Sequence, residues 1–428
     1  MKSRERQVLP LLAVCVAIVL HVLVVLSISS QPPDVGAAPA SERSRVWGLF
    51  HDAVHRVGPA ADFFAVYHAG VAMNQGRSPY QGQEDPRRTP YFYPFRYHPL
   101  VAATLGRAAS LVSPRAAYLL WILTLELLLV GLVVLVRQRL PGQMERVLAT
   151  WVLLVSAPYF LELHMGQFTF AAVGLAAVAL LTAPCPSKPR QALAASAFSA
   201  AVVLKMVPAA MIPALVLHRR WWLPVGLALA LTVGGGLAWF TSHPGDWELF
   251  RQANDIQRSV GEDSGNFSIP HTAALILGRQ VDPRMSWLWR ILLGGWVLVT
   301  VLLCGGRNLL VGASALALVH FCTYPQVWEH HSSAVIVLGL LAMPEVTDVR
   351  SRAAIWGVLI LLAMPSPYFL LDPIKNPALL TPEGWSASRG ILLAASRSIP
   401  TLALMGILLG VLVAATTARH RSTIEYEV

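Results

Sequence analysis

Hydrophobic segments long enough to cross a membrane follow one another along most of the 428 residues, and this layout constrains the fold more than any local motif. Runs of about 17 to 25 apolar residues match the roughly 30 Å hydrocarbon core of a bilayer. Only 13% of the residues are charged, whereas a soluble domain carries about 25%. We therefore expect an all-α polytopic membrane protein, a bundle of about 10 to 13 helices that forms a single integral membrane domain.

The candidate spans are joined by short polar loops, except after the first span, where a polar stretch covers Gln31–Tyr97. The first span is expected to stay uncleaved, because its apolar stretch Val8–Ile28 exceeds a usual signal-peptide core. The apolar segment His98–Val112 carries Arg107 in its middle and is interpreted either as a re-entrant or interfacial helix or as a further span. The other predicted spans are Val8–Ser29, Pro114–Val136, Val147–Leu161, Phe168–Leu181, Ala192–Leu204, Val207–Leu217, Leu223–Phe240, Trp287–Leu303, Leu309–Phe321, Ser332–Met343, Ile355–Met364 and beyond, and Ile399–Thr416.

Basic residues cluster at the ends of the apolar segments, so the net charge of +10 indicates a membrane topology rather than a nucleic-acid surface. If residues 98–112 do not cross, all these clusters fall on the cytoplasmic side, together with both termini. The predicted division is a first transmembrane helix at 1–30, an extracytoplasmic loop at 31–97, a transmembrane bundle at 98–418 and a cytoplasmic tail at 419–428. The topology depends on a break at Lys205, because one long helix there would reverse the middle of the protein.

The layout leaves no room for a nucleotide-binding domain, and the sequence has neither a Walker loop nor a GxGxxG followed by an acidic residue. The four cysteines are scattered and form no CxxC motif, so neither a disulfide framework nor zinc spacing is indicated. An enzyme of this kind has to take an activated donor from the membrane itself, and we expect no cofactor.

Asp62 is the first candidate for chemistry, because it lies in the long outward loop beside Phe63, Phe64 and Tyr67. In one interpretation it only caps the helix that follows, since a carboxylate satisfies free N–H groups at a helix start. In the other it is a general base at the membrane surface. Further along this loop, Arg96 and Tyr97 stand among aromatic residues, which suits a sugar or phosphate site as well as an aromatic belt at the membrane interface.

Three later outward segments also carry polar residues. Gln167 ends a tight turn that begins at Glu162, and its amide is suited to bind a hydroxyl group. Lys205 lies between two apolar runs, where a lysine either extends to the interface or marks a functional site that pairs with a lipid phosphate. His330 and His331 follow Glu329, but adjacent histidines on a helix point about 100° apart, which favours phosphate or hydroxyl contact over a zinc site.

These motifs, in this order, resemble the GT-C glycosyltransferases that use polyprenyl-phosphate sugars. The resemblance is greatest to family 87, which includes mycobacterial polyprenol-phosphate-mannose-dependent α-mannosyltransferases. It spans about Asp62 to His331, although His98 stands where the family usually has proline and Phe267 where it often has glutamine. The matching motifs are Asp62 with Tyr67-His68-Ala69-Gly70, Gly76-Arg77-Ser78-Pro79-Tyr80, Phe95-Arg96-Tyr97-His98-Pro99, Gly166-Gln167, Leu204-Lys205-Met206-Val207-Pro208, Asn266-Phe267-Ser268 and Trp328-Glu329-His330-His331.

The resemblance implies a GT-C-type transmembrane bundle at the plasma membrane with a long first extracytoplasmic loop. It implies that a hexose, most commonly mannose, passes with inversion from a polyprenyl-phosphate donor to a lipid-linked or cell-envelope glycan acceptor. Asp62 would be the general base, and no metal would be required. Residues expected to bind the donor phosphate or sugar are Lys205, His330, His331, Arg96, Gln167, Tyr67, Tyr97 and Asn266.

Two other functions remain open on the sequence. A transporter or flippase for a lipid-linked sugar would place charges near the bilayer midplane and often shows internal repeats. The sequence has one lysine at such a position and no repeat that we recognise, so this interpretation is less favoured. The other alternative is a scaffold protein without an active site.

Overall fold

The computed structural model of the protein describes residues 2–30, 60–81, 95–183, 187–258, 265–279, 283–304, 306–367 and 387–427. Within these ranges every regular element is a helix, and six helices are long and apolar enough to cross a membrane. They cover Val8–Ser29, Pro114–Arg139, Gln143–Met165, Arg219–Ser242, Ser286–Leu303 and Ser388–Thr417. The predicted class, an all-α polytopic membrane protein, is therefore confirmed. The number of crossings stays a prediction, because Thr169–Thr182 and Leu309–Thr323 are apolar but shorter.

Helix α6 (Pro114–Arg139) illustrates how local sequence sets the bounds of a span. Ser113 is its N-cap and accepts a hydrogen bond from the Ala116 amide, and Pro114 supplies a suitable φ at the first helical position. Arg137 and Arg139 occupy the last turn, where cations interact favourably with the helix dipole. Arg137 also donates a hydrogen bond to Thr150 on helix α7 (Gln143–Leu154), which closes the turn between the two helices.

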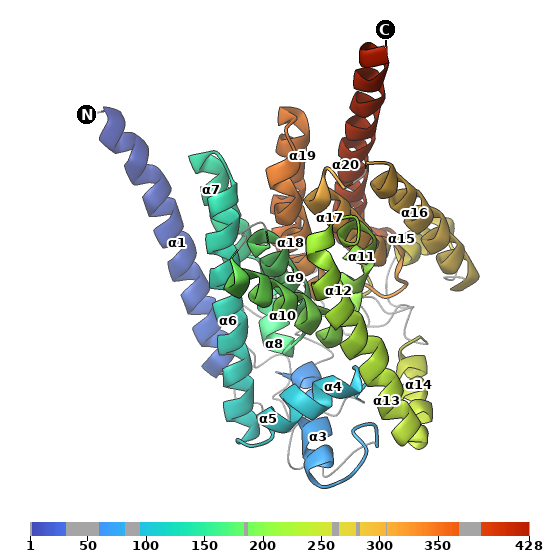
Figure 1. Cartoon of the computed structure of the whole chain (residues 1–428). Coiled ribbons are helices and arrows are strands. Elements are labelled where there is room, and N and C mark those ends of the chain that lie inside the picture. Colours follow the sequence, from blue (N-terminus) through green and yellow to red (C-terminus); the bar gives the residue numbers. More distant parts are fainter. Residues whose placement is uncertain are drawn as a thin grey trace.

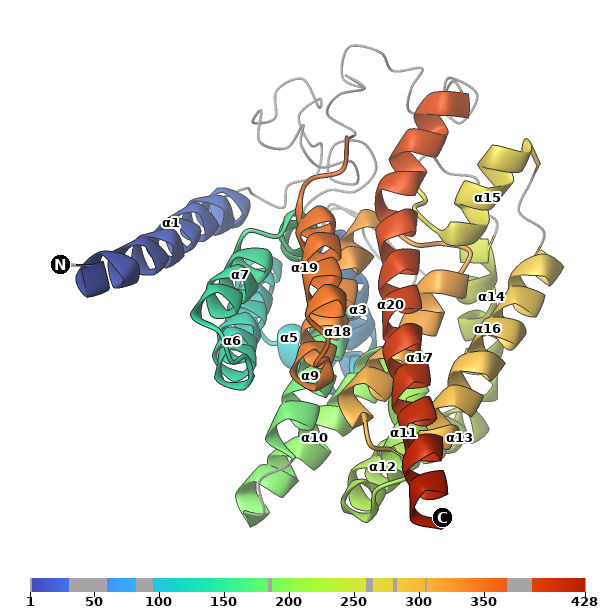
Figure 2. The same ribbon diagram turned by 90° about the horizontal axis from the view of Figure 1, so that it is seen from above.

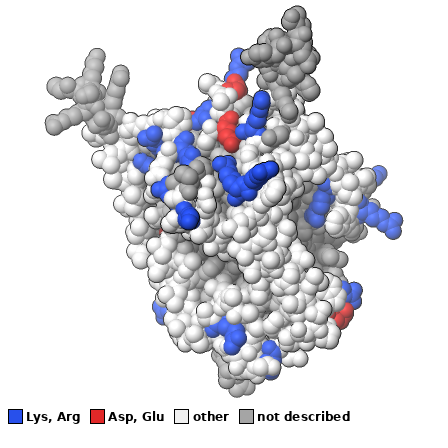
Figure 3. Space-filling model, in the orientation of Figure 1, with Lys and Arg blue, Asp and Glu red and all other residues white. Residues whose placement is uncertain are grey.

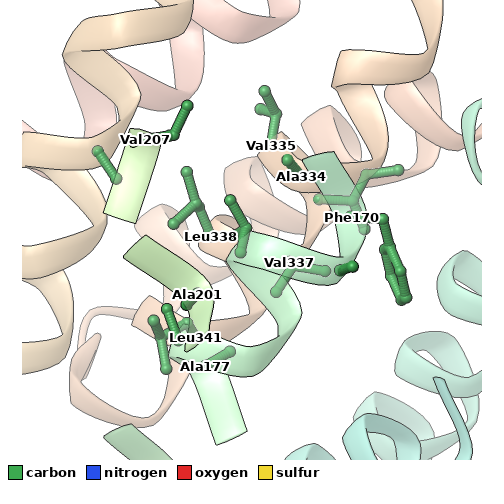
Figure 4. Close-up of a cluster of buried hydrophobic side chains, with 14 of the residues drawn as sticks. Phe170, Ala177, Ala201, Val207, Ala334, Val335, Val337, Leu338 and Leu341 are labelled. Carbon is green, nitrogen blue, oxygen red and sulfur yellow. The ribbon is translucent and has the colours of Figure 1, made fainter. Parts of the chain in front are cut away.

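The core of the bundle consists of helices that other helices surround. Helices α9 (Thr169–Thr182), α17 (Leu309–Thr323) and α18 (Ser332–Ala342) are buried along most of their length. They pack with α10 (Lys188–Leu204) and α19 (Val349–Ala363). Figure 4 shows part of this core, with labelled apolar side chains from α9, α10 and α18 among others. Small residues allow close approach in such packing. A Cβ added at Gly339 of α18, for example, would lie 2.6 Å from the Leu359 side chain of α19.

The helical conformation is interrupted at Lys205, as the predicted topology requires. Helix α10 ends at Leu204, and Lys205 has an extended backbone. A short 3-10 helix, η4 (Val207–Met211), and helix α11 (Ile212–Leu215) follow in place of one continuous helix. The remaining elements are η5 (Arg219–Trp221), α12 (Trp222–Leu229), η6 (Ala230–Gly234), α13 (Gly235–Ser242), α14 (Pro244–Arg258), α15 (Ile269–Leu277), α16 (Pro283–Leu303), η7 (Glu329–His331), η8 (Met343–Glu345) and α20 (Ala387–Glu427).

One end of the bundle carries helix α3 (Ala61–Asn74) and a short helical segment packed against it. This segment consists of α4 (Pro99–Val101), the π-helix η3 (Ala102–Gly106) and α5 (Arg107–Ala109). It extends only about 16 Å at 1.5 Å per residue, which favours the re-entrant or interfacial interpretation of residues 98–112. The contact is very close, because a Cβ added at Gly70 would lie 2.0 Å from the Gly106 carbonyl carbon.

The two termini lie at the opposite end of the bundle from α3, as Figure 1 shows. Figure 2 shows helix α1 (Lys2–Ser30) at the edge of the bundle, where it packs on α7 and on helix α8 (Ala157–Met165). Lysine and arginine side chains gather on the upper part of the face in Figure 3, toward the termini. The end that carries α3 is therefore the place to look for a site that is separate from this basic surface.

Candidate active site

The first turn of α3 is docked on the turn between α8 and α9. The Ala60 amide donates a hydrogen bond to the His164 carbonyl at 2.7 Å, and Ala60 has a left-handed backbone with φ of 64°. Gly166 ends α8 with φ of 64°, and a Cβ added there would lie 2.5 Å from the Phe63 Cβ. Because only glycine fits this close contact, the Gly166-Gln167 motif determines how near α3 comes to α8.

Asp62 occupies the second helical position of α3 and is buried, with 4% of its surface exposed. The interpretation of Asp62 as a helix cap is wrong, because Ala60 is the N-cap residue and no side chain makes a capping hydrogen bond. The Asp62 carboxylate instead faces Arg96, whose guanidinium nitrogen lies 3.5 Å from Oδ1. A carboxylate in the first turn also interacts favourably with the helix dipole. The structure therefore places Asp62 against a cation from a different segment.

Arg96 is held in place by aromatic neighbours on both sides of it. The Tyr80 hydroxyl donates a hydrogen bond to the Tyr97 carbonyl at 2.9 Å, and the Tyr80 ring packs on Phe95 at 5.2 Å. The Tyr97 ring meets Phe168 edge-on at 5.0 Å, just before the start of α9. Tyr80 of the Gly-x-x-Pro-Tyr motif thus acts as an anchor for the segment that presents Arg96.

The Tyr97 phenol lies in the electrostatic field of two carboxylates. Burial raises the pKa of Tyr97, and the carboxylates of Asp62 and Glu162 raise it further, while Arg96 opposes them. The hydroxyl of Tyr97 therefore remains protonated at neutral pH and can donate a hydrogen bond.

Lys205 reaches the same region from the break after α10. Its ammonium group donates a hydrogen bond to Thr169 Oγ1, at the first residue of α9. Burial lowers the pKa of Lys205 to about 8, although the carboxylates of Glu162 and Asp62 oppose this shift. Lys205 therefore carries a positive charge close to Asp62 at neutral pH, and its ammonium group loses this charge at mildly alkaline pH.

Glu162 is a member of this cluster that the sequence interpretation placed only in a tight turn. It is fully buried near the end of α8, and its Oε1 accepts hydrogen bonds from the Phe170 amide and the Ser333 hydroxyl, both at 3.0 Å. The carboxylate also interacts electrostatically with His330 and Lys205. A glutamate at the end of an apolar segment is itself a signal for a functional site, and that signal was available in the sequence.

His330 and His331 lie in η7, the short turn that precedes α18. Their ring centroids are 4.3 Å apart, and His331 Nδ1 accepts a hydrogen bond from the Trp328 amide at 3.0 Å. Burial lowers the pKa of His331 well below its usual value, and the neighbouring His330 and Lys205 add to this effect. His331 is therefore neutral, with its proton on Nε2, and it offers a hydrogen-bond donor rather than a positive charge.

Glu329 and Arg397 form a buried ion pair that fixes this turn. An Arg397 guanidinium nitrogen lies 2.6 Å from Glu329 Oε1, and both side chains are almost completely buried. Ser366 donates hydrogen bonds to Glu329 from its amide and its hydroxyl, at 2.8 and 2.9 Å. Arg397 also donates to the carbonyl groups of Leu361 and Leu362. Helix α20 and the end of α19 thus set the position of the two histidines.

The zinc interpretation of the Glu329 to His331 segment has no support in this geometry. Both oxygens of Glu329 are engaged by Arg397 and Ser366. In the part of the chain that the structure describes, no group of three or more histidine, cysteine or acidic residues is arranged to hold a metal ion.

Two other predicted site residues make contacts that hold the backbone. The Tyr67 hydroxyl donates to the Val112 carbonyl at 3.0 Å. Asn266 accepts hydrogen bonds from the amides of Ser268 and Val327, at 3.0 and 3.1 Å, and donates to the Pro325 carbonyl at 2.6 Å. Asn266 thereby joins the loop before α15 to the loop before η7. These contacts explain both residues as supports of the site, and their contact with a donor stays a prediction.

The structure brings together residues that are far apart in the sequence. Gln167 is buried directly after the α8 turn. The larger part of the predicted loop, residues 31–59 and 82–94, lies outside the described residues. The predicted residues that gather in one electrostatic cluster are Asp62, Arg96, Tyr97, Lys205 and His330.

This fold and this cluster define a class, that of multi-pass membrane proteins with a buried carboxylate and flanking cations at one end of a helical bundle. A sequence model of glycosyltransferase family 87 matches residues 95–344, more than half of the chain. The chain therefore belongs to glycosyltransferase family 87, and the protein is a membrane glycosyltransferase. The matched region includes Lys205 and both histidines and begins after Asp62. No curated protein and no solved structure matches the chain.

Proposed function

We propose that the protein transfers a hexose, with mannose as the first candidate, from a polyprenyl-phosphate donor to a lipid-linked or cell-envelope glycan acceptor. The transfer inverts the anomeric carbon and takes place on the extracytoplasmic face of the cell membrane. The observation that carries this proposal is the cluster in which the Asp62 carboxylate lies 3.5 Å from Arg96 and within the electrostatic reach of Lys205. One group is suited to accept a proton, and the others are suited to hold a phosphate.

In the proposed reaction an acceptor hydroxyl oxygen attacks the anomeric carbon of the donor sugar. Asp62 takes the hydroxyl proton as the new glycosidic bond forms. The bond between the anomeric carbon and the phosphate oxygen breaks on the opposite side, and its electron pair leaves with the polyprenyl phosphate. A single displacement of this kind inverts the anomeric configuration.

The leaving phosphate gains negative charge in this step, so groups that bind it more tightly in the transition state accelerate the reaction. Lys205 and Arg96 are the cations of the cluster, and the neutral His331 adds an N–H donor from η7. The Glu329–Arg397 ion pair fixes η7 and so keeps the histidines next to the cations.

The basic residues support the proposed side of the membrane. Arg137, Arg139 and Arg146 lie around the turn between α6 and α7, and this turn is at the end of the bundle that carries the termini (Figure 1). Short loops rich in arginine stay in the cytoplasm. The proposed site at the α3 end then opens to the extracytoplasmic side, where a polyprenyl-phosphate sugar and a cell-envelope acceptor would meet.

A direct assay tests the proposal. Purified protein in a bilayer is incubated with polyprenyl-phosphomannose and a membrane extract that contains acceptors. We expect donor consumption with a new mannosylated glycolipid or glycan. The polyprenyl-phosphate arabinofuranose donor, assayed in parallel, reports on the choice of sugar. Movement of the lipid-linked sugar across vesicles without turnover would contradict the proposal and favour a flippase.

A further inference from the structure

Two buried oxygen atoms on the α8–α9 turn are left without a hydrogen-bond partner. Among the residues that the structure describes, none bonds to Glu162 Oε2 or to Gln167 Oε1. Both side chains are at least nine-tenths buried. The backbone N–H of Gln167 donates a hydrogen bond to the backbone carbonyl of Glu162 at 2.9 Å, so both residues belong to one turn. Buried polar atoms are almost always paired, and an exception calls for a functional explanation.

The unpaired oxygen of Glu162 is held in a fixed orientation. Its other oxygen, Oε1, accepts two hydrogen bonds, one from the Phe170 amide of α9 and one from the Ser333 hydroxyl of α18. These bonds come from two helices of the buried core, so the carboxylate cannot turn without breaking one of them. Oε2 is thus a preorganised acceptor.

A second glutamate, which is only half-buried, shows what a structural carboxylate looks like in this chain. Glu345 is the last residue of η8, and its Oε2 accepts hydrogen bonds from the Leu310 and Val311 amides at the start of α17. It therefore caps a helix, and both of its bonds are explained by the fold. Glu162 differs because it is fully buried and its second oxygen, Oε2, is itself buried without a hydrogen-bond partner.

The chemistry of the two unpaired atoms indicates the kind of group that they bind. Both are acceptors, and a carboxylate or amide oxygen repels the oxygens of a phosphate but accepts a hydrogen bond from a hydroxyl. Lys205, which carries the donor groups suited to phosphate, interacts electrostatically with Glu162. The cluster is thus divided into a cationic part and a part with acceptor oxygens. A sugar phosphate has the complementary division, with an anionic phosphate next to a ring of hydroxyl groups.

We propose that Glu162 and Gln167 bind the transferred sugar, with Glu162 Oε2 and Gln167 Oε1 each accepting a hydrogen bond from a different sugar hydroxyl, and that Glu162 thereby selects the sugar. This inference rests on the proposed transfer from a polyprenyl-phosphate sugar. It adds a residue that determines specificity to that reaction. A site built to bond a hydroxyl discriminates strongly against a substrate that lacks it.

A double-mutant cycle between protein and donor tests the inference. The donors are polyprenyl-phosphomannose and its four monodeoxy analogues, which lack the 2-, 3-, 4- or 6-hydroxyl. The variant Glu162→Gln keeps the shape and the Oε1 acceptor but places an NH₂ donor where Oε2 was. We expect it to lower kcat/KM for the parent donor about 10- to 100-fold, the range of a lost hydrogen bond to a charged group.

The decisive result is whether the losses of kcat/KM from the Glu162→Gln variant and from a deoxy donor depend on each other. With one deoxy donor, the kcat/KM of the wild type should fall by about the same factor as that of Glu162→Gln falls with the parent donor. The variant and that deoxy donor together should lower kcat/KM little more than either change alone. Gln167→Leu should couple in the same way to a different hydroxyl. For the control variant Glu345→Gln, each deoxy analogue should lower kcat/KM by the same factor as it does for the wild type.

The possible failures are distinguishable. If the wild type transfers all four deoxy donors within about twofold of the parent donor, the inference is overturned on the wild-type protein alone, whatever the variants do. Additive losses for Glu162→Gln with every analogue would overturn it as well, and the proposed function would stand. If the wild type transfers no polyprenyl-phosphate sugar, the proposed function falls and the inference falls with it.

Discussion

Two charged clusters lie close together in this protein and differ in how completely their groups are paired. In the first, which we call the closed pair, Glu329 and Arg397 meet at 2.6 Å, and Ser366 supports the carboxylate. In the second, the open cluster, Asp62 and Arg96 are 3.5 Å apart and Glu162 keeps an unpaired oxygen. Lys205 of the open cluster bonds to a neutral threonine hydroxyl. Charges that are tightly paired hold a fold, whereas charges that are loosely paired can act on a substrate.

The position of each cluster fits this division. The closed pair joins η7 to α20 and to the end of α19. A buried ion pair adds little net stability over an apolar packing, but removal of one partner is strongly destabilising. The open cluster has contributions from α3, the segment before α4, α8 and the break after α10. We therefore assign a structural role to the closed pair and a chemical role to the open cluster.

The largest expected effect is that of Asp62→Asn on turnover. The amide keeps the size of the side chain but cannot take the acceptor proton, so we expect kcat to fall about 10²- to 10⁴-fold. Donor binding and thermal stability should stay close to those of the wild type. Asp246→Asn is the matched control, because Asp246 is also buried but bonds to the Trp239 indole at 2.8 Å. Near-normal turnover of Asp62→Asn would remove this residue from the mechanism.

Next in size is the effect of breaking the closed pair. Arg397→Met leaves Glu329 buried without its partner, and we expect a loss of about 3 to 5 kcal/mol in the free energy of unfolding. Unfolding in a titration with denaturing detergent measures it. The double variant Glu329→Gln with Arg397→Met should recover part of this stability, because no uncompensated charge remains. A stable Arg397→Met protein would show that the pair is not an architectural element.

Lys205→Ala is expected to weaken donor binding. Loss of one hydrogen bond to a charged phosphate corresponds to a rise in the donor Kd of about 10- to 100-fold. Equilibrium binding of a labelled polyprenyl-phosphate sugar measures this change. Lys188→Ala provides the control, because Lys188 is the exposed first residue of α10, the helix after which Lys205 lies. Equal affinities of Lys205→Ala and the wild type would place the phosphate elsewhere.

The smallest effect is the pH dependence of donor binding. Because burial lowers the pKa of Lys205 to about 8, the positive charge is present below this pH and is lost as the pH rises through it. We expect the donor Kd to increase above about pH 8, by up to tenfold for each pH unit. Lys205→Arg should bind the donor without this dependence, since arginine keeps its charge. The same pH profile in both proteins would contradict the assignment.

The sequence predicted the helical framework well because its signals are local. The predicted first span Val8–Ser29 has the same bounds in the structure, and the break at Lys205 is present. The prediction for α19 began too late, at Ile355 instead of Val349. Arg352 lies before the predicted start of this span, but it is helical and pairs with Glu145 of α7 at 2.6 Å. A long-range ion pair of this kind extends a helix beyond its apolar run.

The site was predicted only in part, because sequence signals are local and most contacts of the site are not. Asp62 and Lys205 stand out locally, as a carboxylate among aromatic residues and as a lysine between apolar runs. The pairing of Glu329 with Arg397 joins residues 68 positions apart, and that of Glu162 with Ser333 joins residues 171 positions apart. Such contacts depend on how the helices pack, which no local pattern contains. The sequence therefore predicted which residues are unusual, and the structure was needed to separate those that pair from those that do not.

A structure determined with a donor analogue bound tests the division between the two clusters most directly. The analogue is a polyprenyl phosphonate of mannose, in which carbon replaces the oxygen that would be cleaved. We predict a phosphonate oxygen at about 2.7 to 2.9 Å from Lys205 Nζ, an anomeric carbon that faces Asp62, and a Glu329–Arg397 pair that keeps its distance of 2.6 Å. A head group bound away from Asp62 and Lys205, or one that opens the Glu329–Arg397 pair to bind, would contradict the account.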